Sequence, residues 1–233
     1  MRTVLVLAIA SACAIPDDKT FNNLYCPNTR GIPNEITVTG TITNPLHQDM
    51  PFNGAVRDIQ VQAMPNGFTA MTDGSGTFSG TLPIAGSGDQ VSFLLTGSNY
   101  FPSVFFPALD LTANYHVTAE VFLESDIAEL ASAGITVGSD TQQMIISAVD
   151  CLEEGVPGVS INTTPGDVIY LDGSDEPDPT LTATEGLYAA ALVTNIDQPN
   201  VIVQGSTPGS GFARHTVPVG SGVLTETELA PQQ

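Results

Sequence analysis

The thiol of Cys13 is the side chain whose place in the sequence points most directly to a chemistry, because a cysteine thiolate is a nucleophile that can be acylated. Met1-Arg2 is a short positive start, an apolar run covers residues 4–9, and the small residues Ala-Ser-Ala at 10–12 end just before Cys13. This order is typical of a cleaved secretory signal peptide over residues 1–12. The apolar run is too short to cross a bilayer, which takes about 20 residues. The sequence predicts a mature chain that begins with Cys13.

A cysteine directly after the small residues makes this segment resemble the lipobox of bacterial lipoproteins. In that family the thiol is diacylated with long chains such as palmitate, and the cysteine becomes the lipid-bearing N-terminus. The resemblance implies that residues 13–34 are a lipidated tether on a membrane of the bacterial cell envelope. Ala14 is not the aspartate that retains some lipoproteins at the inner membrane, so the resemblance favours the outer membrane. The alternative is an ordinary signal peptide and a secreted protein.

The two other cysteines, Cys26 and Cys151, form an even pair once Cys13 carries the lipid. A secreted chain folds in an oxidising compartment, where such a pair can form a disulfide. Their separation in the sequence leaves open whether they meet, and two free or buried thiols are the alternative.

One dense acidic run offers a candidate metal site. It covers residues 171–178 and contains Asp172, Asp175 and Asp178. Carboxylate oxygens are the ligands that calcium prefers, but the run lacks the twelve-residue spacing and closing glutamate of an EF-hand loop. A solvated loop without metal is the alternative, and no other cofactor is expected.

No residue set has the spacing of a catalytic site. The Gly-Ser-Gly triplets at 74–76, 86–88, 209–211 and 220–222 lack the G-x-S-x-G spacing of a hydrolase nucleophile. His47, His116 and His215 are isolated, and the chain has neither H-E-x-x-H nor C-x-x-C. The sequence predicts a protein that is not an enzyme.

The chain is strongly acidic, with a formal net charge of −20 at pH 7. Its five basic residues are Arg2, Lys19, Arg30, Arg57 and Arg214. Because they form no cluster, nucleic acid is excluded as a partner, and docking on anionic lipid headgroups is disfavoured. We expect most of the carboxylates on a solvated surface.

Short strands separated by turn residues begin at residue 35. Residues 36–42 and 59–63 alternate between apolar and polar side chains, as half-buried strands do. Pro-Asn-Gly at 65–67 and Asp-Gly-Ser-Gly at 73–76 are turn signals between further strands. This rhythm predicts a β-sandwich domain over residues 35–123.

Residues 124–142 break the rhythm. Ser125 can cap a helix, Ile127, Leu130 and Ala131 have helical spacing, and Gly134 can end it, which predicts a connector with a short helix. The first pattern then returns in weaker form, since residues 144–150, 155–161 and 182–188 match earlier segments of the chain. We therefore expect a second sandwich over residues 143–233.

Each half resembles the carboxypeptidase regulatory-like domain, a transthyretin-like β-sandwich. In the first half the resemblance rests on Val38-Thr39-Gly40-Thr41-Ile42, on Gly54-Ala55-Val56 and on Thr72-Asp73-Gly74-Ser75-Gly76-Thr77-Phe78. In the second half it rests on residues 156–159 and 184–188, a shortened version. The resemblance implies an all-β protein of two tandem immunoglobulin-like or transthyretin-like sandwiches. The family is named for its place beside a zinc peptidase, and no such catalytic domain is present.

Together these features predict a non-enzymatic, lipid-anchored envelope protein that acts as a structural or protein-interaction module. Its expected partners are the membrane, through the lipid, and an envelope protein that the sequence does not identify. A secreted glycan- or calcium-binding module is the alternative. Sugar-binding sandwiches usually present aromatic platforms, whereas this chain has no Trp and five Tyr.

Overall fold

The computed structural model describes residues 34–44, 55–65, 67–84, 91–108, 111, 113–126, 131, 141–173, 176–186 and 189–231. Over these ranges the chain forms β-strands joined by turns, which confirms the all-β class. No helix in these ranges is long and apolar enough to cross a membrane. The predicted signal peptide and tether, with Cys13 and Cys26, lie outside them.

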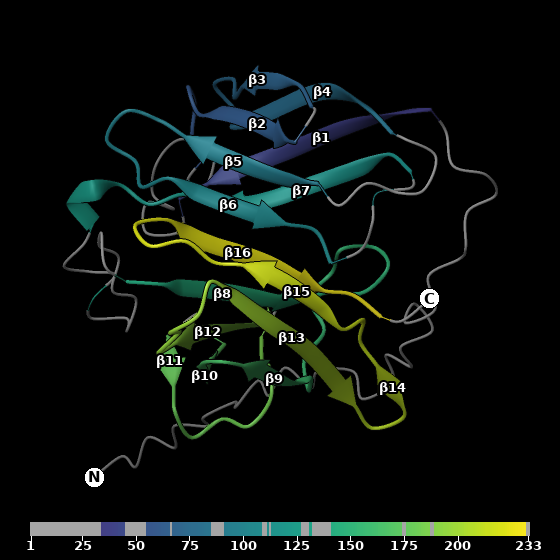
Figure 1. The fold of residues 1–233 in the computed structure, drawn as a ribbon, viewed down its shortest axis with the longest axis vertical. Helices are drawn as coiled ribbons and strands as arrows, with labels where there is room; N and C mark the ends of the chain where they lie inside the picture. Colours follow the sequence, from purple (N-terminus) through teal and green to yellow (C-terminus); the bar gives the residue numbers. More distant parts are fainter. Residues whose placement is uncertain are drawn as a thin grey trace, which may run out of the picture.

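The first sandwich is built from the strands that precede residue 121. They are β1 (Glu35–Thr43), β2 (Gln60–Met64), β3 (Thr69–Met71), β4 (Thr77–Pro83), β5 (Ser92–Thr96), β6 (Ser103–Phe106) and β7 (Tyr115–Glu120). A sheet of order β4-β1-β7 lies against strands β3-β2-β5-β6 (Figure 1). The first and last strands, β1 and β7, run parallel to each other.

Alternation decides which side chains of β1 enter the first core, because successive residues of a strand point to opposite faces. Ile36, Val38 and Ile42 are buried, while the intervening threonines lie outside the core. The ring of Phe78 points inward from β4 and lies over Gly40, where a Cβ would come within 2.3 Å of the ring. Gly40 therefore lets this aromatic ring pack directly on the backbone of β1.

The second sandwich is built from the strands that follow residue 142. They are β8 (Gln143–Ala148), β9 (Ser160–Thr164), β10 (Asp167–Leu171), β11 (Pro177–Asp178), β12 (Ala190–Thr194), β13 (Asn200–Thr207), β14 (Ser210–Gly211), β15 (His215–Pro218) and β16 (Leu224–Leu229). Strands β11-β10-β12-β8-β16 form one layer, and β13 with β9, β14 and β15 forms the other. Phe212, Val203 and Val217 are fully buried between the layers.

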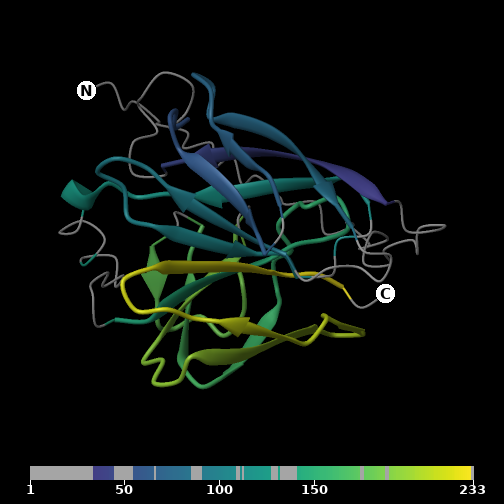
Figure 2. The ribbon, with the colours of Figure 1, turned by 45° about the horizontal axis from the view of Figure 1, so that its top comes forward.

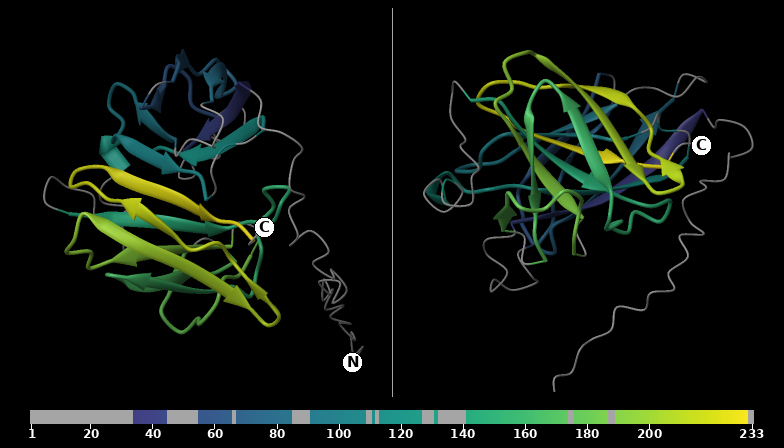
Figure 3. Two further views of the ribbon diagram at one scale, coloured as in Figure 1. Left: turned by 45° about the vertical axis from the view of Figure 1, so that its right-hand side comes forward. Right: turned by 90° about the horizontal axis from the view of Figure 1, so that it is seen from below.

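The two sandwiches share one continuous sheet. Strand β16 runs parallel to β8 of the second sandwich on one side and parallel to β6 of the first on the other. The resulting nine-stranded sheet has the order β11-β10-β12-β8-β16-β6-β5-β2-β3. Figure 2 and the left view of Figure 3 show the yellow β16 lying between the two sets of strands. The sequence predicted two tandem domains but not this shared strand.

Strand β6 also contributes to both cores. Phe105 is buried in the first core, whereas its neighbour Phe106 packs against the second. Alternate side chains of one strand therefore serve different sandwiches, as expected of a strand that lies where two packed units meet.

The weak internal repeat has a precise structural counterpart in two buried threonines. The hydroxyl of Thr72 donates to the Val56 carbonyl at 2.7 Å and accepts from the Ile59 N–H at 3.0 Å. The hydroxyl of Thr184 donates to the carbonyl of residue 156 at 2.8 Å and accepts from the N–H of residue 159 at 2.9 Å. Equivalent threonines therefore hold equivalent loops in the two sandwiches through the same pair of hydrogen bonds.

The connector between the sandwiches is described only near its ends. Glu124–Asp126 form the 3₁₀ turn η2, and the buried carboxylate of Asp126 accepts hydrogen bonds from the Leu123 N–H at 3.0 Å and the Asn44 side chain at 3.2 Å. The short helix predicted in this connector is not confirmed. Residues 127–130 and 132–140, which would form most of it, lie outside the described ranges.

Candidate functional site

Strand β16 has two buried faces with different partners. Its side chains alternate, so residues 225, 227 and 229 point to one face and residues 224, 226 and 228 to the other. Leu229 enters the core of the second sandwich. Glu226 and Glu228 point toward β7 of the first sandwich, and both are at least nine-tenths buried. Two carboxyl groups are therefore enclosed where the sandwiches meet, although the sequence led us to expect carboxylates at the surface.

Each of these carboxyl groups receives one hydrogen bond from β7. Glu226 Oε2 accepts from the Glu120 N–H at 3.0 Å, and Glu228 Oε2 accepts from the Tyr115 hydroxyl at 2.7 Å. The second oxygen of Glu226, Oε1, is buried and has no hydrogen-bond partner in the described part of the protein. A buried oxygen without a donor is costly, more so when the group is charged.

A third carboxylate near β7, that of Glu153, comes from the loop after β8, and Asp150 shapes this loop. Asp150 Oδ1 accepts from the Leu152 N–H at 2.7 Å and the Glu154 N–H at 3.1 Å, which closes a tight turn. In this turn Glu153 has a φ of 63°, in the left-handed region. The turn directs Glu153 at β7, where its carboxylate accepts a hydrogen bond from the His116 backbone N–H.

These carboxylates close the outer edge of β7. The Val121 N–H donates to the Thr43 carbonyl of β1 at 2.9 Å, so by alternation the N–H groups of Glu120 and His116 face away from β1. Each of these two N–H groups meets a glutamate of the second sandwich instead of another strand. Side-chain carboxylates thus cap a sheet edge that would otherwise present free donors.

Burial dominates the electrostatics of the junction. Desolvation raises the pKa of Glu226 well above its usual value, the charge of Glu120 raises it further, and the Glu120 N–H opposes the rise. Desolvation raises the pKa of Glu228 to about 7, although the Tyr115 hydrogen bond lowers it. The pKa of Tyr115 is raised well above 10 by burial and by Glu228. Burial likewise raises the pKa of Glu153.

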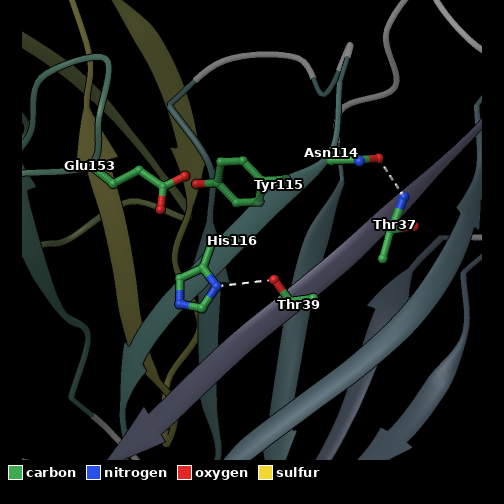
Figure 4. A pocket seen from close by; sticks show the side chains of 6 residues that line it. All are labelled: Thr37, Thr39, Asn114, Tyr115, His116 and Glu153. Atoms are coloured by element: carbon green, nitrogen blue, oxygen red, sulfur yellow. Dashed lines mark hydrogen bonds between the residues drawn. The ribbon is translucent and has the colours of Figure 1, made fainter.

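A shallow polar pocket of about 320 Å³ opens beside this junction (Figure 4). Its lining residues are Thr37, Thr39, Asn114, Tyr115, His116 and Glu153. His116 Nδ1 lies 3.0 Å from the Thr39 hydroxyl, but Glu153 bonds the backbone of His116 and not its ring. The three groups therefore do not form the hydroxyl–imidazole–carboxylate relay that activates a nucleophile. The Thr39 hydroxyl, the His116 ring and the Glu153 carboxylate instead present separate hydrogen-bonding groups to solvent.

His215 ties together strands β15, β16 and β6. Its Nε2 lies 3.0 Å from the Thr227 hydroxyl, which donates to the Phe106 carbonyl at 2.8 Å. Burial lowers the pKa of His215, which favours the neutral ring. This histidine therefore acts as a structural cross-link.

Of the predicted site residues, only Cys151 lies beside the junction; the others lie apart from it or outside the described residues. Cys13, Cys26 and Asp175 lie outside them. Cys151 is disulfide-bonded, and its pairing with Cys26 stays a prediction. It lies in the same turn as Glu153.

The two described calcium-ligand candidates of the acidic run, Asp172 and Asp178, are engaged in local turns. Asp172 Oδ1 accepts from the Glu176 N–H at 3.1 Å, and Asp178 Oδ1 accepts from the N–H and the hydroxyl of Thr180, each at 2.7 Å. No group of three His, Cys, Asp or Glu residues with metal-binding geometry occurs in the described ranges. The candidate calcium site and the alternative of a solvated loop are distinguished by the calcium titration described in the Discussion.

Sequence reasoning missed Glu153, Glu226 and Glu228. The alternation of Thr and Glu between Leu224 and Leu229 is typical of a strand with one solvated face. Nothing in it shows that both faces are covered.

Comparison with known proteins finds distantly similar solved structures but does not assign the chain to a family. No protein-family model matches the chain, and no curated protein matches it. A type II cohesin–X-dockerin complex from Acetivibrio cellulolyticus is 17% identical over 42% of this chain and 73% of that chain, with a TM-score of 0.29. The shaft pilin SpaA from Lactobacillus rhamnosus GG is 11% identical over 86% of this chain and 98% of that chain, with a TM-score of 0.25. A streptococcal ancillary pilin is 10% identical over 85% and 69%, with a TM-score of 0.29. Scores this low assign neither a family nor a function.

Proposed function

We propose that this chain is a non-enzymatic envelope lipoprotein, in which two fused β-sandwiches form a rigid structural or protein-interaction unit on a lipid-anchored tether. We also propose that both sandwiches belong to the carboxypeptidase regulatory-like class. The matched threonine hydrogen bonds and the parallel first and last strands of both units support that assignment.

The observation that carries the structural role is the shared strand β16. Domains joined by a linker usually move relative to each other. Here the backbone of β16 pairs with β6 and β8 at once, and all six of its residues are buried. Such a junction resists bending, so the two sandwiches act as one body that can hold a surface at a fixed distance and orientation.

The sequence before the sandwiches supports the anchor. An extended tether over residues 13–34 spans at most about 80 Å. Two or three acyl chains on Cys13 give firm anchoring, because each buried CH₂ contributes roughly 0.8 kcal/mol. The rigid body is then held near the membrane by a segment that contains three prolines, Pro16, Pro27 and Pro33.

The test is the mass and location of the full-length precursor expressed in a bacterium. We expect the mature chain to begin at Cys13, to carry the mass of a diacylglycerol, and to sediment with membranes. Cys13→Ser should remove the added mass and release the protein into soluble fractions, whereas Cys26→Ser should keep both. An unacylated, freely soluble wild type contradicts the anchor.

The interaction role is tested separately by cross-linking intact cells and identifying proteins bound to the wild type. We expect an envelope protein that is captured by the wild type and lost with Cys13→Ser, since the soluble form no longer meets it at the membrane. Equal capture by both forms would contradict an interaction that depends on anchoring.

A further inference from the structure

Two buried carboxyl groups lie at the junction between the sandwiches. Glu226 and Glu228 lie on the strand that joins the sandwiches, and each is bonded to β7 through one oxygen. Among the described residues, no donor reaches the other, buried oxygen of Glu226. A neutral carboxylic acid tolerates such a site far better than a carboxylate does.

No compensating cation faces these carboxyl groups in the described part of the chain. The permanently charged bases in this part of the chain are Arg57 and Arg214, and both are exposed. Neither arginine contributes to the pKa shifts of Glu226 and Glu228. Strand β7 contributes Tyr115, Glu120 and His116, whose charge lowers the pKa of Glu153, and the loop after β8 contributes the exposed Glu153. The flanking strands β6 and β8 contain no titratable residue. The charged groups that act on Glu226 and Glu228 themselves are therefore carboxylates.

We propose that the junction is a proton-controlled latch, in which protonated Glu226 and Glu228 hold β16 against β7 and their ionisation loosens the two sandwiches from each other. As the carboxyl groups ionise, negative charge accumulates on the buried Glu226 and Glu228, beside the half-buried Glu120 and the exposed Glu153. Repulsion and desolvation then oppose the packed arrangement. The rigid body would thus stiffen in mildly acidic surroundings and become mobile in alkaline ones.

The direction follows from linkage. Both groups bind a proton more tightly in the folded protein than in the unfolded chain, because burial raises their pKa, that of Glu228 to about 7. Their contribution to stability is therefore complete below the usual pKa of a glutamate and is lost as the pH rises through the folded value. Burial lowers the pKa of His215, so its contribution to the pH dependence of stability has the opposite sign. The contribution of the two glutamates is therefore obtained by comparing the pH profiles of the wild type and the glutamate variants.

The test compares urea unfolding of the disulfide-intact protein with that of Glu228→Gln and of Glu226→Gln/Glu228→Gln between pH 5 and 8.5. We expect the wild-type unfolding constant, taken relative to that of Glu228→Gln, to rise by up to about tenfold per pH unit up to pH 7. The double variant should extend the difference to higher pH. Glu185→Gln, at an exposed site, should follow the wild type. Parallel pH profiles for wild type and double variant would overturn the proposal.

A second measurement covers the case in which the double variant does not fold. Carboxyl ¹³C resonances of Glu226 and Glu228 in the wild type should titrate well above the usual glutamate value, that of Glu228 near pH 7. Small-angle scattering of the wild type should show a larger radius of gyration at pH 8.5 than at pH 5.5. Titration of both resonances near the usual glutamate value, or an unchanged radius, contradicts the latch.

Discussion

Tyr115 and Glu228 join the two sandwiches through a hydrogen bond of 2.7 Å from the phenol to the carboxyl group. Tyr115→Phe removes the donor and leaves the Glu228 oxygen buried without it. We expect a loss of about 1–3 kcal/mol in the free energy of unfolding, with the larger loss at pH 8, where the carboxyl group is ionised and the bond is charge-assisted. Urea unfolding at pH 5.5 and 8 measures both values.

Tyr100→Phe is the matched control for this prediction. Tyr100 also packs against the first core, but no hydrogen bond of its hydroxyl is seen among the described residues. We expect a change within about 0.5 kcal/mol. An equal loss for both variants would mean that the loss does not come from the hydrogen bond between Tyr115 and Glu228.

The paired threonines Thr72 and Thr184 give a second prediction. Replacing either with Val keeps the shape but leaves one buried N–H and one buried carbonyl without their partner, which costs about 1–3 kcal/mol. Because the sandwiches share a sheet, either substitution should shift one common thermal transition. Two separated transitions would contradict that coupling. Thr81→Val, on the exposed face of β4, is the control and should change little.

Asp73 gives a third prediction, on local titration. Its Oδ1 accepts from the Ser75 hydroxyl at 2.6 Å, the Ser75 N–H at 2.8 Å and the Thr77 N–H at 3.1 Å. These bonds, the Ser75 hydroxyl foremost, lower the pKa of Asp73 to about 2. The folded value lies below the unfolded one, so the stabilisation is present above pH 4 and is lost as the pH falls through 2.

The measurement for Asp73 is carboxyl NMR between pH 1.5 and 6. Ser75→Ala should raise the pKa of Asp73 toward its usual value, while Ser79→Ala, an exposed residue of the following strand, should leave it unchanged. A wild-type value near 4 would show that the turn does not hold the ionised form.

Calcium binding by the acidic run gives a fourth prediction. The Asp178 Oδ1 that would bind the ion already accepts two hydrogen bonds from Thr180. We therefore expect millimolar calcium to leave the melting temperature unchanged, whereas an ion at 100 times its dissociation constant would stabilise by about 2.7 kcal/mol. A rise that disappears in Asp172→Asn would establish the calcium site and favour the secreted binding module.

The hairpin of the first sandwich could be predicted from its residues because its interactions are local. The Thr-Asp-x-x-Gly-x-Phe motif specifies its own geometry: Asp73 closes the turn, Gly76 has a φ of 72°, and Phe78 points inward. Each step depends on residues fewer than six positions apart, so sequence pattern captures it.

The junction could not be predicted because it depends on contacts far apart in the chain. Strand β16 pairs with β6, more than a hundred residues earlier, through backbone groups that every sequence possesses. Strands buried in parallel pairing are usually apolar throughout. The glutamates at 226 and 228 contradict that pattern, and their burial follows from the position of β7, which no local signal reveals.

Hydrogen exchange of the β16 amides at pH 6 tests the shared sheet most directly. A C-terminal strand that merely ends a domain frays and exchanges early. The account predicts that the amides of Thr225, Glu226 and Thr227 are protected as strongly as those of β1 and β8, because both edges of β16 are paired. Rapid exchange of these three amides, while β8 stays protected, would show that β16 does not join the sandwiches.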